Sequence, residues 1–238
     1  MKIGGGRNLG SAPAFTLAEV LVTLGIIGVV SAMTVPTLMQ NYQRKSYVTQ
    51  LHKVYNELQQ ALLQYQNDRN ALNLKEAGLI SKANVKIFFE DYIKFVQSCD
   101  GVLAPCFSTS YKNINGGNVN TISTWSAGSC VVMSSGSSIC MDHPATYNNG
   151  SFGYVFIDIN GSQGPNILGR DAFYLSIFPD GVLDVKDAGI DCRTKGECSE
   201  GKSLTEVRGT VEACKATINY VQHSCFGQIL NNNWEMNY

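Results

Sequence analysis

Histidine is scarce in this 238-residue sequence, and the motifs of the common enzyme classes are missing from it. The three histidines, His52, His143 and His223, include no pair at the spacing by which a helix presents two ligands to one metal ion. No hydrolase, phosphate-loop or dinucleotide-binding motif occurs either. We therefore expect a protein that is not an enzyme, and we keep a membrane-anchored hydrolase only as a minor alternative.

An excess of charge of either sign is also missing. Eighteen basic residues stand against nineteen acidic ones, which leaves a formal net charge of -1. A chain with that balance carries no overall attraction for a polyanion. The composition therefore gives no indication of nucleic acid as a partner.

Cysteine is missing from the first 98 residues, and all eight cysteines follow in four neighbouring couples. An even number confined to one part of a chain indicates disulfides formed in an oxidising compartment. Zinc is the competing interpretation, but no couple has the two-residue spacing of a zinc knuckle. We favour sequential disulfides, because each couple closes a short loop: Cys99 with Cys106, Cys130 with Cys140, Cys192 with Cys198, and Cys214 with Cys225.

Charge is nearly missing from Phe15 to Met39, where Glu19 is the only charged residue. In a helix that rises about 1.5 Å per residue, this segment exceeds the roughly 30 Å thickness of bilayer hydrocarbon. The segment 15–39 is therefore a transmembrane-helix candidate. A cleaved secretory signal is the alternative, with Ser31 and Ala32 as its peptidase site, although small residues also precede the apolar run here.

The helical pattern continues beyond the apolar run. From residue 40 to residue 70, apolar side chains recur at three- and four-residue steps, with charged and amide side chains between them. Pro36 lacks a backbone N–H and is expected to kink the helix near the membrane boundary. The apolar stripe of the segment 40–70 needs a partner, and the later β-rich region is the obvious one.

The remaining segment, 71–238, has the pattern of a globular α+β domain. A second helix is predicted over the apolar residues between Val85 and Val96, with Phe95 on its apolar face. We expect this domain to present an antiparallel sheet to the long N-terminal helix. Turn signals separate its strand-like runs: a hairpin over residues 130–141, strands over 152–159 and 172–178, and a further strand after the turn at 179–181.

The N-terminal details match those of a known family. A basic leader, residues 1–14, ends in the small residue Ala14, and Phe15 follows with Thr-Leu-Ala-Glu-Val and the apolar run. This pattern resembles the N-terminal signal of type IV pilins and type II secretion pseudopilins, which usually have Gly where this chain has Ala14. The resemblance implies that a prepilin peptidase cuts between Ala14 and Phe15 and methylates the new amino group of Phe15. It also places Glu19 and Pro36 where the family carries a glutamate and, in many members, a proline.

A carboxylate within an apolar helix is costly to insert and asks for a partner. In assembled filaments of the family, the glutamate meets the N-terminal amine of a neighbouring subunit, so the resemblance implies an assembly role for Glu19. The alternative is that Glu19, so near the mature end, extends to the headgroup layer without a partner. Small surfaces for close helix packing come from Gly25, Gly28, Ser31 and Ala32.

Two stretches outside the N-terminus also resemble pseudopilin-like proteins with disulfides. They are 156–181, with its Asp-Ile-Asn-Gly and Gly-Pro-Asn runs, and 225–238, with Asn233 where Gly is usual. We expect Trp234 in the second stretch to be a core anchor rather than a ligand-binding aromatic.

Asp158, Asn160 and Asp171 are weak calcium candidates, since some major pseudopilins bind calcium in a loop of the globular domain. Their run lacks the spacing and the bidentate Glu of an EF-hand. We favour a Gly-rich turn in which these side chains bond the local backbone. No other cofactor is expected.

Taken with the resemblance, these features predict a structural subunit that works by assembly. Its implied partners are homologous pilin or pseudopilin subunits, a prepilin peptidase, an inner-membrane assembly platform with its ATPase, and the membrane itself. The implied location is the bacterial inner membrane, single-pass with a periplasmic globular domain, and the cell surface or exterior after assembly. The alternative is a membrane-anchored periplasmic or extracellular binding module that does not assemble. Type II secretion, type IV pili and DNA uptake stay open, as does major or minor status.

Overall fold

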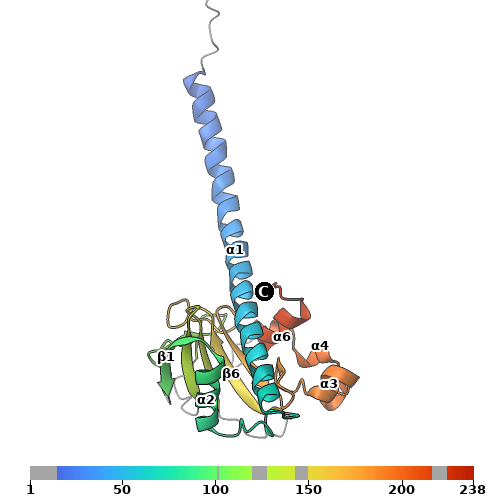
Figure 1. Ribbon diagram of the computed structural model, residues 1–238. Helices are drawn as coiled ribbons and strands as arrows, with labels where there is room; N and C mark the ends of the chain where they lie inside the picture. Colours follow the sequence, from blue (N-terminus) through green and yellow to red (C-terminus); the bar gives the residue numbers. More distant parts are fainter. Residues whose placement is uncertain (1–14, 101, 120–127, 143–149, 216–223) are drawn as a thin grey trace, which may run out of the picture. The chain divides into compact units, whose positions relative to one another are not determined.

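The computed structural model describes residues 15–100, 102–119, 128–142, 150–215 and 224–238 (Figure 1). The chain divides into two compact units, Met1–Gln43 and Arg44–Tyr238; we call the second one the globular unit. The predicted leader, with Ala14, lies outside the described residues, as do His143 and His223.

The described chain begins with one long helix, α1 (Leu17–Asp68). Every residue from Phe15 to Met39 is exposed. The helix continues through Pro36, and the kink expected there stays a prediction. Within the globular unit, large apolar residues of α1 are buried at three- and four-residue steps, which confirms the predicted amphipathic stripe for Leu51, Val54, Leu58, Leu62 and Tyr65. At its start Tyr47, which was predicted to belong to the stripe, is half-buried, and its neighbour Val48 is buried instead.

The globular unit is built around a six-stranded antiparallel sheet, and the predicted α+β class is confirmed. Its strands lie in the order β1 (Phe95–Asp100), β4 (Ser129–Met133), β5 (Ser138–Met141), β6 (Gly153–Asp158), β7 (Ala172–Ile177) and β8 (Leu183–Asp184). The predicted hairpin is β4 with β5, and the strand after the turn at Pro179 to Gly181 is β8. A separate antiparallel pair consists of β2 (Tyr111–Lys112) and β3 (Asn118–Val119).

The predicted extent of the second helix was wrong at its C-terminal end. Helix α2 (Lys82–Tyr92) stops at Ile93, which is extended (φ −120°, ψ 129°), and Phe95 and Val96 belong to the edge strand β1. Phe95 pairs with Met133 of β4. The apolar spacing continued to favour a helix, but pairing with a neighbouring strand satisfies the backbone of these residues instead.

Both faces of the sheet are buried, and each faces a different core. Because side chains alternate along a strand, neighbours such as Val155 and Phe156 enter opposite cores. The first core lies between the sheet and α1, as Figure 1 shows, and the second lies under the segment that contains Phe107 and Tyr111. The amphipathic stripe of α1 thus has the partner that was expected.

Short helices complete the C-terminal region: α3 (Ile190–Lys195), the 3-10 helix η2 (Ser199–Gly201), α4 (Leu204–Val207), α5 (Val211–Lys215) and α6 (Ser224–Asn231). Arg208 donates two hydrogen bonds to the buried carboxylate of Asp184, at 2.7 and 3.1 Å. Trp234 stacks on His52 with ring centroids 4.0 Å apart and meets Tyr55 edge-on, which confirms it as a packing anchor. These contacts join the C-terminal region to β8 and α1.

Candidate functional site

The first candidate is the exposed apolar part of α1. Within the described residues, α1 is the one helix long and apolar enough to cross a membrane. Large apolar side chains there are all exposed, from Val20 at 41% to Phe15 at 87%. A Cβ placed on Gly25 or Gly28 would meet nothing within 4 Å, so both small surfaces are open to another molecule.

Glu19 closes a capping box at the start of α1. The backbone N–H and the hydroxyl of Thr16 both donate to Oε2 of Glu19 at 2.9 Å, and the N–H of Glu19 donates back to the Thr16 hydroxyl at 3.2 Å. This reciprocal pattern satisfies backbone donors that a helix start would otherwise leave unpaired. The Thr-x-x-Glu spacing is the sequence signal of this capping role, which was not among the predictions for Glu19.

The second oxygen of Glu19 stays available. Both hydrogen bonds from Thr16 reach Oε2, and Oε1 has no partner among the described residues. The structure therefore gives Glu19 a local role without using all of its acceptor capacity.

The four disulfides have the sequential pairing that was favoured, and no cysteine is free. Cys130 and Cys140 face each other across β4 and β5, and Cys99 of β1 lies beside Cys130 in register. The other two disulfides join Cys192 to Cys198 beside α3 and Cys214 of α5 to Cys225 of α6. They tie down segments that contribute little to the main sheet.

The calcium candidates lie in the connection between β6 and β7. Oδ2 of Asp158 accepts a 2.6 Å hydrogen bond from the Tyr111 hydroxyl, and its Oδ1 accepts from the N–H of Asn160 at 3.2 Å. The Asp171 carboxylate accepts from two backbone N–H groups, of Asn166 at 2.8 Å and of Ile167 at 2.6 Å. Both carboxylates thus bond the loop that they flank, which supports the turn interpretation.

Burial dominates the electrostatics of this carboxylate pair. Asp158 and Asp171 are fully buried. Burial raises the pKa of Asp158 to about 8, with the Tyr111 hydrogen bond opposing the rise and the Asp171 charge adding to it. Burial also raises the pKa of Asp171, against its backbone hydrogen bonds.

The donor set is small for a calcium ion. The Oδ1 atoms of Asn160 and Asn166 are buried and lack partners. However, Ca²⁺ takes six to eight oxygen ligands, and no group of three or more histidine, cysteine or acidic side chains suited to a metal occurs in the part of the chain that the structure describes. The geometry therefore favours a loop held by its own carboxylates.

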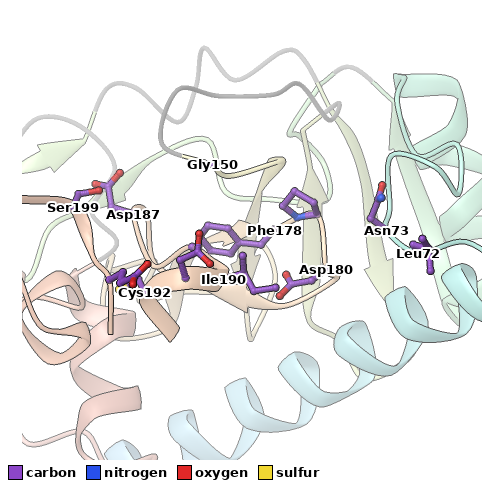
Figure 2. Close-up of a pocket in the computed structure, with 13 residues that line it drawn as sticks. Leu72, Asn73, Gly150, Phe178, Asp180, Asp187, Ile190, Cys192 and Ser199 are labelled. Atoms are coloured by element: carbon purple, nitrogen blue, oxygen red, sulfur yellow. The ribbon is translucent and has the colours of Figure 1, made fainter. Parts of the chain in front are cut away.

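A cavity of about 440 Å³ is a site that the sequence did not reveal (Figure 2). Four separate segments line it: Leu72 and Asn73 just after α1, Gly150 ahead of β6, the β7–β8 turn with Phe178 and Asp180, and residues 187–199 around α3. In Figure 2 the labelled side chains form a floor that includes Phe178 and Ile190, with carboxylates beside them. We refer to this cavity as the groove.

The groove carries four carboxylates, of which two have counter-ions. Arg193 pairs with Asp180 at 2.8 Å, and Lys195 pairs with Asp191 at 3.0 Å. The side chains of the other two, Asp187 and Glu197, form no ion pair or hydrogen bond among the described residues.

Comparisons of this chain with protein-family models, with curated proteins and with solved structures found no match. The family resemblance therefore rests on residues of the chain itself, and its consequences are taken up as a proposal.

Proposed function

We propose that this protein is a filament subunit of the type IV pilin and type II secretion pseudopilin class, processed by a prepilin peptidase and assembled through its N-terminal helix. The observation that carries the proposal is the apolar segment Phe15–Met39, every residue of which is exposed, placed ahead of a disulfide-bonded globular unit in the chain. The Ala-Phe junction at Ala14 and Phe15 is the point of cleavage and methylation.

An exposed apolar helix of this length must be shielded from water by lipid or by other protein. Lipid provides this shielding for a single-pass inner-membrane precursor, since the segment exceeds the hydrocarbon thickness. Neighbouring helices provide it after assembly, when Gly25 and Gly28 allow close approach. The four disulfides support a globular unit on the oxidising, periplasmic side.

Glu19 aligns one subunit against the next in this proposal. Its Oε2 is held by Thr16, and its Oε1 is available for the methylated amine of a neighbouring Phe15. Two buried opposite charges then offset each other's desolvation, and the capping box holds the carboxylate in a single orientation for that contact.

Three variants separate the charge of Glu19 from its capping role. Glu19→Gln keeps a capping-box side chain but removes the charge, Glu19→Ala removes both, and Thr16→Ala removes the hydroxyl cap alone. We expect all three to be inserted and cleaved. Both Glu19 variants should be lost from the sheared filament fraction, and Thr16→Ala should remain in it.

Two results would overturn parts of this proposal. Normal incorporation of Glu19→Gln would remove the charge-pair role. A wild-type chain that keeps Met1 by mass spectrometry, or never enters filaments, would remove the filament function itself.

A membrane-anchored binding module is the second candidate, and the groove is the observation that favours it. Such a module would keep the same helix in the membrane and would be missing from sheared filaments. The filament fraction therefore discriminates between the two functions, while the choice among secretion, pilus and DNA-uptake systems needs the neighbouring genes.

A further inference from the structure

Unpaired basic side chains gather at the end of the globular unit where that unit begins on α1. Arg44, Lys45 and Arg170 form no ion pair among the described residues. Burial raises the pKa of Tyr47, the charge of the buried Asp171 adds to the rise, and Arg170 opposes it. Burial also raises the pKa of Tyr238, while Arg44 opposes that rise.

The Tyr238 hydroxyl donates to the carbonyl of Gly169 at 2.8 Å, next to Arg170 in the chain. The three cations therefore share one region, which we call the basic end.

The groove lies at the other end of the same helix. Leu72 and Asn73 follow the last turn of α1, so about 36 Å of helix separates the basic end from the groove. Two apolar side chains stand exposed beside the groove, Leu72 at 88% and Ile190 at 53%. Together with the carboxylates of the groove, these two side chains offer another molecule both apolar and acidic contacts.

The groove and the basic end carry opposite charges, and the long side chains of the basic end suit an apolar surface with acidic margins. Glu197 of the groove has no counter-ion among the described residues, and Asp187 forms no ion pair there, although the charge of Lys202 lies close enough to interact with it. The cations of the basic end form no ion pair among these residues either. Arginine and lysine stems cover apolar surface while their charged heads reach polar groups. An apolar groove with acidic margins fits such side chains.

We propose that the groove receives the basic end of a second copy of this chain, so that globular units stack end to end. The stems of Arg44 and Lys45 lie over Leu72 and the groove floor, and their charged heads meet Asp187 and Glu197. This inference rests on the proposed filament function and adds to it a contact outside the N-terminal helix.

The geometry makes this contact self-propagating. Because the two surfaces differ and lie at opposite ends, each new copy leaves one basic end and one groove unoccupied, so the contact builds an open series rather than a closed pair. Exposed ion pairs are individually weak and are screened by salt. The contact therefore orients neighbours whose main attraction comes from their helices.

Two full-length variants test the stacking directly. The first, Arg44→Glu with Lys45→Glu, makes both ends acidic. The second, Asp187→Asn with Glu197→Lys, removes the acidity of the groove; asparagine is chosen because Asp187 has a φ of +68°, which asparagine tolerates. Each is produced alone and together with the other in a host that assembles the wild-type chain.

We expect each variant alone to lose about tenfold or more of its sheared filament fraction, because like charges facing each other disfavour a contact. Co-production should restore assembly, since the acidic end of the first variant then meets the basic groove of the second. Matched controls change exposed charges by the same amount elsewhere: Lys53→Glu with Lys94→Glu, and Glu90→Lys with Asp91→Asn. Both controls should assemble like the wild type.

The outcomes separate this inference from the proposed function. If wild-type filaments form and the variants assemble as well as their controls, or if co-production restores nothing, the stacking contact is wrong and the filament function stands. If the wild type forms no filament, the proposed function fails, and sedimentation of the purified full-length chains in detergent then decides the contact. Salt-sensitive association of the wild type and of the mixed variants supports it, and equal behaviour of all chains refutes it.

Discussion

Replacing Asp158 by asparagine should remove a pH-dependent loss of stability from the globular unit. The side chain is fully buried at the end of β6, where its Oδ2 accepts the 2.6 Å hydrogen bond from Tyr111. Burial raises the pKa of this carboxyl from an ordinary value of 3.8 to about 8. Asparagine can accept the same hydrogen bond through Oδ1 and has no proton to release in this range.

The direction follows from the two pKa values. Between about pH 4 and pH 8, the folded chain keeps a proton on Asp158 that the unfolded chain has released, so stability is present at low pH and is lost as the pH rises. The slope for one such group is about 1.4 kcal/mol per pH unit. The wild type should therefore lose about 3 kcal/mol of unfolding free energy between pH 5 and pH 7 through this residue.

Urea unfolding of the full-length chain in detergent, followed by tryptophan fluorescence at several pH values from 5 to 8, measures this slope. EDTA is included so that cation binding does not contribute. We expect Asp158→Asn to be less stable than the wild type at pH 5 by about 1 kcal/mol, because one backbone N–H loses its acceptor. By pH 8 the order should be reversed.

Asp91→Asn, a change at an exposed acid on α2, is the matched control and should leave the wild-type slope intact. Equal slopes in the wild type and in Asp158→Asn would refute the reasoning, since they would mean that Asp158 ionises in the folded chain as it does in the unfolded one.

Three further changes probe the packing of the globular unit, each measured by urea unfolding. Arg208→Met should lower the unfolding free energy by about 3 kcal/mol, because it leaves the buried Asp184 carboxylate without its cation. A loss no larger than that caused by replacing an exposed arginine with methionine would contradict the pairing. Replacing Cys130 and Cys140 together by serine should cost about 3 kcal/mol through loss of a short closed loop, and an unchanged midpoint would show that the bond does not restrain the unfolded chain. Gly227→Ala should cost about 2 kcal/mol, because a Cβ there would overlap the backbone carbonyl of Arg208, and wild-type stability would show that the two segments can separate.

Elements that depend on neighbouring residues in the chain were predictable. The stripe from Leu51 to Tyr65 is a helical period, the β4–β5 hairpin is two short apolar runs around a turn, and the disulfides join cysteines that are close in sequence. Each of these signals is contained within a few turns or strands, so no knowledge of the fold was needed to find them.

The end of α2 was not predictable in the same way. Phe95 and Val96 continue an apolar spacing that suits a helix. They form a strand because β4 lies beside them and pairs with their backbone, which the sequence does not reveal. The capping box of Thr16 and Glu19 is different, because its signal was present in the sequence and was overlooked in favour of the charge alone.

The sequence by itself determined that this chain has an apolar N-terminal helix, an amphipathic continuation of that helix and a disulfide-bonded α+β unit. Periodicity and cysteine spacing are local properties, so these features could be found without the fold. Only the tertiary structure decided that Asp158 and Asp171 are buried together, that the groove exists, and that Arg193 pairs with Asp180 at its margin. Burial, cavities and charge pairing depend on which segments, distant in the sequence, pack against each other. Local sequence patterns do not reveal those contacts.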